Sequence, residues 1–276
     1  MFKQLSDAEM LAVPIIVAIT CTDTTTDTSS RQAIACVWYK GETGSGATFE
    51  IQAAGNWVFT TDGTTPDTSV VASTGIIDLS TPAAGYDTWG EVAAVINASG
   101  NWGCRLLAVL PEDSTDNTSE TQAEVDLSTA ARKKSGWFVY GDSSVSFETA
   151  VCISGFQPTG VAGVFEDDDN CINWVNYVSA VANFDSGTCA IKIYSANQTS
   201  STLLYTSSAM TTDTVINCGT NGDIGFIPSK YGERLVVKID ASADLDSYTL
   251  SVIGKCFDLK AKHMKAGFTL TNYPTA

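Results

Sequence analysis

The sequence predicts a mainly β protein with two β-rich lobes, the first containing one helix and the second forming an antiparallel β-sandwich. Three observations lead to this fold class. Short apolar runs recur along the 276 residues and are separated by Gly, Ser, Asn and Asp turns, as in all-β folds. Only 17% of the residues are charged, which suits many short strands better than a helical bundle. The most distinct helical signal covers only residues 88–97.

The predicted helix has a start signal, an apolar face and a stop signal. Thr88 and Glu91 have the spacing of a capping box, in which two side chains satisfy the first free amides of a helix. Gly100 suits the left-handed residue beyond the helix end. The apolar face repeats at i, i+3, i+4 and i+7, on Trp89, Val92, Ala93 and Ile96. We therefore expect Trp89 and Ile96 in the core of the first lobe.

Strands are predicted on both sides of this helix. A capping box at Ser6 and Glu9 predicts a short additional helix over 7–12, ended by Pro14. The spacing of apolar residues in 171–182 fits either a buried strand or a helix. The β-branched and aromatic content of this stretch favours a strand. The predicted strands are 15–21, 33–40, 48–52, 57–60, 105–110, 137–140, 145–153, 161–165, 171–182, 190–195, 202–206, 223–227, 234–241, 247–253 and 268–271.

A change of composition predicts the domain boundary. Residues 127–136 are small, polar and basic, and stronger strand signals flank them. We therefore predict an N-terminal β-rich domain over 1–133, with the short helix, and a C-terminal β-sandwich domain over 134–276. The basic residues 132–134 are expected to be an exposed linker and the first site of limited proteolysis.

The charge of the chain excludes some partners. The formal net charge is −16, and between Lys40 and Arg132 the only basic residue is Arg105. Such a surface repels a phosphate backbone, so no nucleic-acid partner is expected. The apolar run at 11–19 is too short to span a bilayer, and Asp7 and Glu9 replace the basic start of a signal peptide. We therefore expect no membrane partner.

No motif predicts catalysis or a cofactor. The eight cysteines lack C-x-x-C spacing and the single histidine, His263, is near none of them, which argues against a zinc or redox site and leaves both free thiols and disulfides open. Nucleophile-elbow, Walker and dinucleotide motifs are absent from the sequence. Carboxylate pairs of a glycoside hydrolase remain an alternative, because such pairs are far apart in sequence. We expect a non-enzymatic protein without catalytic residues.

The densest group of oxygen ligands lies in the second half of the chain. Calcium takes six to eight oxygen ligands, and consecutive carboxylates on a turn supply several. The spacing of an EF-hand is missing, so a solvated loop is the simpler interpretation. The weak calcium candidates are Glu166, Asp167, Asp168 and Asp169.

The stretch 75–110 contains Asp78-Leu79-Ser80, Tyr86-Asp87-Thr88-Trp89-Gly90-Glu91 and Val95-Ile96-Asn97, followed by a Gly-containing turn and a strand. This order of motifs resembles a segment of virion proteins from tailed bacteriophages. Residues 232–240 and 248–255 are similar to late strands of phage head or tail sandwiches. Together these passages cover about a quarter of the chain.

The resemblance implies a structural protein of the virion, assembled in the host cytoplasm. A capsid decoration (cement) protein is the first expectation, with the major capsid protein and neighbouring copies of this chain as partners, forming a homo-oligomer on the particle. A phage tail or fibre component is the second. The alternative from another class is an extracellular carbohydrate-binding or hydrolytic β-protein.

The N-terminal arm, residues 1–11, is the predicted contact with neighbours. Chain ends without partners are usually mobile, and an apolar short helix is marginal in water unless it is packed. The arm is therefore expected to dock on its own domain or on a neighbouring subunit. Its apolar residues are Phe2, Leu5, Met10 and Leu11.

Overall fold

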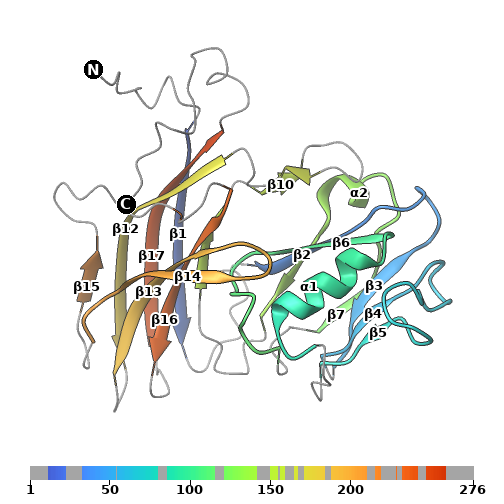
Figure 1. The fold of residues 1–276 in the computed structure, drawn as a ribbon, viewed down its shortest axis with the longest axis horizontal. Helices are drawn as coiled ribbons and strands as arrows, with labels where there is room; N and C mark the ends of the chain where they lie inside the picture. Colours follow the sequence, from blue (N-terminus) through green and yellow to red (C-terminus); the bar gives the residue numbers. More distant parts are fainter. Residues whose placement is uncertain are drawn as a thin grey trace.

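The fold is mainly β and antiparallel, as predicted, and divides into two β-rich parts (Figure 1). In the computed structural model, the described residues are 12–22, 33–53, 55–79, 86–115, 121–141, 150–154, 156–158, 165–166, 171–183, 188–209, 215–218, 228, 232–241 and 247–258. The predicted strands 223–227 and 268–271 lie outside these ranges, as does all but the last residue of the predicted helix 7–12.

The part that contains the helix spans residues 33–141 and is called the insert below. Its first sheet has the order β6-β2-β8 and its second the order β5-β4-β3-β7. The strands of the first sheet are β2 (Ala33–Tyr39), β6 (Trp102–Leu106) and β8 (Trp137–Tyr140). Those of the second are β3 (Thr48–Ile51), β4 (Trp57–Phe59), β5 (Ile76–Ile77) and β7 (Gln122–Asp126).

Helix α1 (Trp89–Ala98) has the predicted capping box, and it packs on β6. The Glu91 amide donates to Thr88 Oγ1 over 3.4 Å, and the Thr88 amide donates to Glu91 Oε2 over 3.1 Å. Gly100 follows the helix with a φ of +78°, which a residue without Cβ adopts at little cost. The local signal alone was therefore sufficient to place both ends of α1.

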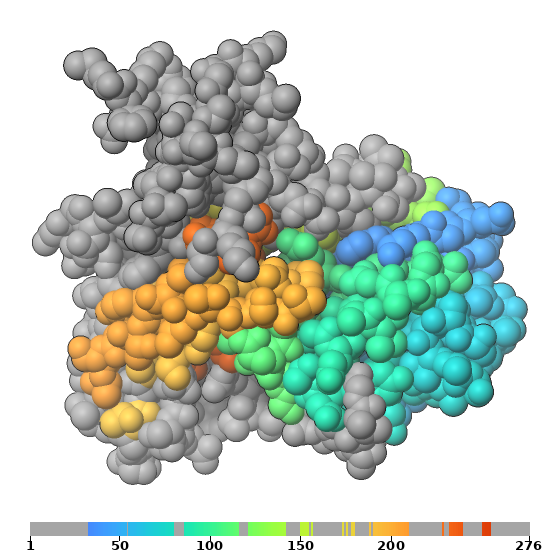
Figure 2. All heavy atoms as spheres, viewed as in Figure 1, coloured from blue at the N-terminus to red at the C-terminus, as the bar shows by residue number. Residues whose placement is uncertain are grey.

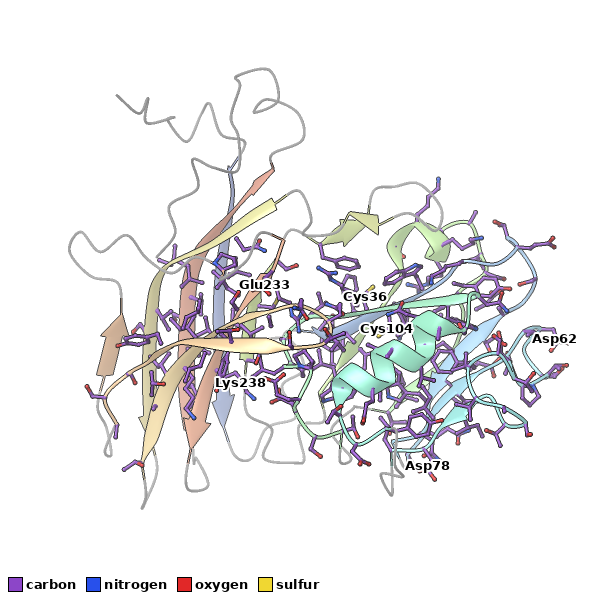
Figure 3. The ribbon with its side chains drawn as sticks, viewed as in Figure 1. Cys36, Asp62, Asp78, Cys104, Glu233 and Lys238 are labelled. Carbon is purple, nitrogen blue, oxygen red and sulfur yellow. The ribbon has the colours of Figure 1, made fainter. Side chains whose placement is uncertain are left out.

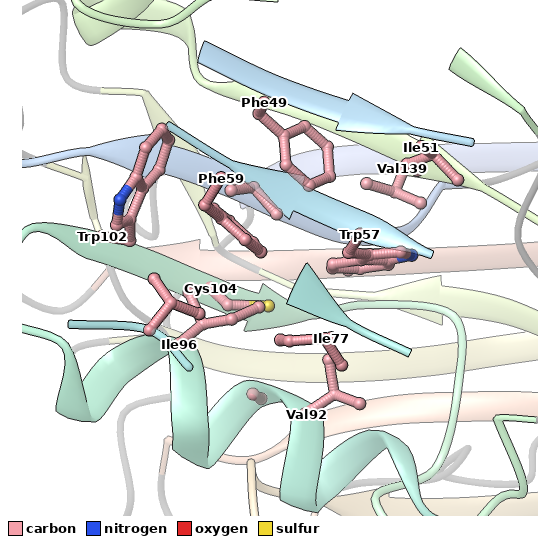
Figure 4. Packing of buried hydrophobic residues seen from close by; sticks show 14 of the residues in the cluster. Phe49, Ile51, Trp57, Phe59, Ile77, Val92, Ile96, Trp102, Cys104 and Val139 are labelled. Carbon is pink, nitrogen blue, oxygen red and sulfur yellow. The ribbon is translucent and has the colours of Figure 1, made fainter. Parts of the chain in front are cut away.

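Aromatic rings fill the core between the two sheets and α1 (Figure 4). The Trp57 ring centroid lies 5.6 Å from that of Trp89 and 5.4 Å from that of Phe49. Trp89 and Ile96 are both fully buried, which confirms the predicted apolar face of the helix. The Phe49–Trp57 pair is edge-to-face, a geometry that adds to the stabilisation from buried area.

The second part, called the sandwich below, consists mainly of two four-stranded sheets. One has the order β1-β17-β12-β15 and the other β14-β13-β16-β9. The strands of the first are β1 (Ala12–Thr22), β12 (Cys171–Asn183), β15 (Val215–Cys218) and β17 (Ser247–Asp258). Those of the second are β9 (Ala150–Ile153), β13 (Cys189–Ala196), β14 (Ser201–Thr206) and β16 (Arg234–Ala241). A further pair comprises β10 (Gln157–Pro158) and β11 (Phe165–Glu166). Residues 171–182 are strand, as predicted.

The sheets do not follow the predicted division into 1–133 and 134–276. β1 pairs along its whole length with β17, from Ala12 opposite Phe257 to Thr22 opposite Ser247. β8, beyond the predicted boundary, pairs with β2 in the insert. Residues 33–141 are therefore inserted between the first strand of the sandwich and the others. Composition could not reveal this arrangement, because strand partners are chosen over long distances in the chain.

The expectation of an exposed linker at residues 132–134 holds only in part, because Arg132 and Lys134 are exposed but Lys133 is buried. They begin the short helix α2 (Arg132–Ser135), which lies against β2. The Lys133 side chain is only 6% exposed; its ammonium donates to the Gly41 carbonyl and lies 5.7 Å from the Tyr39 ring centroid. The Arg132 guanidinium lies 4.5 Å from the Trp137 ring centroid. Long basic side chains bury their apolar stems when the charged end finds such partners.

Candidate functional site at the junction of the two parts

The insert and the sandwich meet where residues 107–113, called the junction segment below, lie against β16. Every residue of β16 from Arg234 to Ile239 is buried. Side chains alternate between the two faces of a strand, and in β16 both faces are covered. Arg234 and Lys238 contact the junction segment, and Val236 packs with Ala108 and Leu110 in one apolar cluster.

Arg234 is fully buried and binds main-chain carbonyl oxygens from both parts. Its Nε donates to the Leu107 oxygen over 3.0 Å, and its Nη2 donates to the Val109 oxygen over 2.8 Å. Its Nη1 donates to the carbonyls of Ala196 and Asn197 at the end of β13. A planar guanidinium has five donors in a fixed fork, so Arg234 holds the junction segment and the β13–β14 turn in one geometry.

Asp113 links the sandwich to the start of helix α1. Lys238 Nζ lies 2.9 Å from Asp113 Oδ1, and Oδ2 of the same carboxylate accepts the Leu110 amide over 2.7 Å. The Asp113 carbonyl accepts the Trp89 amide over 3.1 Å. One residue therefore contacts β16 with its side chain and the first turn of α1 with its main chain.

Gly90 allows the junction segment to approach the helix closely. Its amide donates to the Pro111 carbonyl over 2.8 Å. A Cβ at Gly90 would lie 3.0 Å from that oxygen and 3.1 Å from the Pro111 Cβ, so a side chain here would push the segment away. The first free amides of a helix need acceptors, and here the junction segment supplies two of them.

A third link comes from the turn between β13 and β14. Gln198 Oε1 accepts the Leu106 amide over 2.7 Å, and Gln198 Nε2 donates to the Leu106 carbonyl over 3.4 Å. A side-chain amide has the same donor and acceptor groups as a peptide, so Gln198 acts as a strand partner at the edge of β6. Ser201 also donates to Glu112, and Figure 2 shows the orange surface of β14 against the green surface of the insert.

Glu233 is the buried acidic residue next to Arg234, and two neutral side chains donate hydrogen bonds to its carboxylate. Ser195 Oγ donates to Glu233 Oε2, and Asn197 Nδ2 donates to Oε1 over 3.3 Å. The Glu233 carbonyl accepts Asn173 Nδ2 from β12 over 2.8 Å, which joins the two sheets of the sandwich. Figure 3 shows Glu233 and Lys238 on the sandwich side of the molecule.

Asp67 has a comparable structural role inside the insert. It is 2% exposed and accepts hydrogen bonds from Trp102 Nε1 over 2.8 Å, from Asn101 Nδ2 and from Ser69. Burial works to raise the pKa of Asp67, but these hydrogen bonds outweigh burial, and the pKa lies below its ordinary value of 3.8. Asp67 therefore stays ionised and holds its loop against the Trp102 ring.

Two cysteines of the insert, Cys36 and Cys104, are not suited to chemistry. Cys36, Cys104 and Cys152 are buried thiols. Burial raises the pKa of Cys36 to about 12, slightly offset by a hydrogen bond to the Trp137 backbone. Burial also raises the pKa of Cys104, and nearby Cys36 adds to the effect; Figure 3 labels both in the insert. The thiolate is the reactive form, so these two thiols are inert near neutral pH.

The predicted site residues fall almost entirely outside the described ranges. Glu166 is in β11, whereas Asp167, Asp168 and Asp169 are not described, so calcium binding stays a prediction. The arm residues Phe2, Leu5, Met10 and Leu11 are not described either. Within the described ranges, no three His, Cys, Asp or Glu side chains lie together as metal ligands. No described helix is both long and apolar enough to cross a bilayer.

Sequence reasoning missed the junction residues. The signal that could have found them is in residues 234–241, where Arg234 and Lys238 fall on one face of a strand that is apolar apart from these two residues and Asp240. Basic side chains four residues apart on one face of a central strand indicate a second layer that supplies acceptors. No local pattern marks Asp113 as the partner of Lys238.

The comparisons with known proteins assign no family to this chain. No protein-family model matches it, and no curated protein matches it. Among solved structures, a chain described as "Structure of infectious bursal disease virus Gt strain" is 13% identical, with 89% of this chain and 72% of that chain covered and a TM-score of 0.20. A TM-score of that size establishes no common fold, so the conclusions below do not depend on this likeness.

Proposed function

We propose that this chain is a non-enzymatic virion structural protein, specifically a capsid decoration (cement) protein that stabilises a phage-like head by bridging capsid subunits. The observation that supports the proposal is how the described residues use buried charge. Each buried charged side chain binds a partner inside the chain, and two of them join the insert to the sandwich. These side chains are Asp67, Lys133, Glu233, Arg234 and Lys238.

This arrangement suits a bridging role for a physical reason. A protein that binds two capsid subunits resists their separation only if its own parts stay together under load. Interactions of Arg234 and Lys238 across the junction favour such a rigid body. A ligand that binds only the assembled shell stabilises that shell by mass action. The net charge of −16 would also keep crowded copies and particles apart.

Quantitative mass spectrometry of purified particles tests the proposal. We expect a fixed ratio of this chain to the major capsid protein, close to the number of capsomers. A few copies per particle would instead identify a tail or fibre component. Absence from particles, together with release of reducing sugars from glycans by the purified protein, would contradict a virion role and support the hydrolytic alternative.

Rebinding to stripped heads tests the bridging step itself. Heads freed of the protein by mild denaturant should recover their resistance to heat when the purified protein is added back. Recovery should saturate at the copy number found in the native particle. Saturable binding without any gain in heat resistance would contradict the cement role while leaving the virion location intact.

The N-terminal arm is the contact that we propose for neighbouring subunits. Because Ala12 is the first residue of β1 and pairs with Phe257, removal of residues 1–11 leaves the strand pairing intact. Replacing its four apolar residues by Ser should abolish head binding or self-association without unfolding the protein. Leu203→Ser, at a 50% exposed position in β14, is the matched control. Normal binding by the arm variant would exclude the arm as the contact.

A further inference from the structure

We propose that the junction segment is a coupling latch, which makes the insert and the sandwich open and unfold together as one cooperative unit. The segment contacts helix α1 through the carbonyls of Pro111 and Asp113, and it contacts β16 through Arg234 and Lys238. The latch is a property of the fold itself and does not depend on the proposed function.

The latch continues directly from the sheet of the insert. The amides of Leu107 and Ala108 donate to the carbonyls of Ile34 and Ala33, so the segment extends the pairing between β6 and β2. Ala108, Val109 and Leu110 are all at most 3% exposed. The segment therefore hydrogen-bonds to the insert through its main chain and packs against the sandwich through its side chains. It cannot move without disturbing both parts.

Arg234 makes the latch all-or-none. A buried charge that loses its partners is strongly destabilising unless water reaches it. Release of the Leu107 and Val109 carbonyls would leave the guanidinium without two of its acceptors inside the protein. Small displacements of the segment are therefore unfavourable, and the junction is either closed or widely open.

Asp113 carries the coupling to the helix. Detachment of Lys238 from Asp113 frees the carboxylate that also holds the Leu110 amide. That change loosens the turn at 110–113, whose carbonyls accept the first two amides of α1. The start of the helix is consequently sensitive to events at β16.

Hydrogen exchange in increasing denaturant, read by mass spectrometry on peptides from α1 and from β13, tests the latch. In the wild type both peptides should lose protection at one common midpoint. In Arg234→Met and in Asp113→Ala the α1 peptide should open before the β13 peptide, with exchange faster by about tenfold or more. Separate midpoints in the wild type, or a common midpoint in both variants, would overturn the proposal.

Asp126→Ala is the matched control. Asp126 also accepts an amide and a hydroxyl, both from Ser128, but these bonds lie entirely within the insert. This variant should lower the common midpoint without separating the two peptides. If Arg234→Met does not fold, Gln198→Ala removes the half-exposed link to Leu106 with less disturbance, and it should separate the midpoints in the same order.

Discussion

The insert and the sandwich are both β-rich, but different interactions stabilise them. The insert packs aromatic rings between two small sheets and α1, with Trp57, Trp89 and Trp102 fully buried. The described core of the sandwich is aliphatic, with Val and Ile on paired strands such as β13 and β16. Its buried polar residues are concentrated around Glu233 and Arg234.

The two parts also differ in how far apart along the chain their paired strands lie. The second sheet of the insert contains a run of strands that pair with their neighbours in chain order, β3 with β4 and β4 with β5. The sandwich is closed by pairs far apart in the chain, above all Val17 opposite Val252. Long-range pairing costs more chain entropy. We infer that the buried polar bonds of the sandwich help to fix which strands meet.

The largest expected effect tests whether the aromatic core dominates the stability of the insert. Trp89→Ala should lower the free energy of unfolding by about 3–5 kcal/mol, because it leaves a large cavity between α1 and Trp57. Ile193→Ala in the sandwich should cost less, about 2–4 kcal/mol. Denaturant unfolding followed by circular dichroism measures both, and a larger loss at Ile193 would reverse the comparison.

Asp67→Asn tests whether a buried charge also stabilises the aromatic insert. Loss of charged hydrogen bonds should cost about 2 kcal/mol at pH 7. Because the folded-state pKa of Asp67 lies below its ordinary value of 3.8, its contribution is present above pH 4 and disappears as the pH falls through the folded-state value. Unfolding measured from pH 7 to pH 2 should show the two proteins converging in stability; a constant difference would contradict this assignment.

Thr88→Ala tests the local signal that predicted the helix. Loss of the cap to the Glu91 amide should cost about 1 kcal/mol. Thr206→Ala is the control, because Thr206 lies at the exposed end of β14 and caps no helix. Equal unfolding midpoints for the Thr88 variant and the wild type would mean that the junction segment alone fixes the start of α1.

Leu203→Ala should have the smallest effect. The side chain is 50% exposed on the edge strand β14, and substitutions at such positions usually change stability by less than about 0.5 kcal/mol. Thermal unfolding measures the change. A loss above about 1 kcal/mol would mean that the outer face of the sandwich contributes to its core more than its exposure indicates.

The sequence by itself determined the local elements. Thr88, Glu91 and the spacing of Trp89 to Ile96 were sufficient to place α1, because caps and the 3.6-residue period act within a few residues. The apolar runs predicted many of the strands for the same reason. The composition also determined the mainly β class, since few charged residues and many turn residues suit sheets.

Only the tertiary structure decided which strands are neighbours and where charge is buried. The pairing of β1 with β17, the position of Lys133 against Tyr39, and the bonds from Arg234 to the junction segment all join residues far apart in the chain. Each depends on whether a distant group arrives in the right place to bury a surface or satisfy a donor. The physical reason is that the local sequence of a strand or the identity of a lysine does not specify its distant partner, which is selected only when the chain folds.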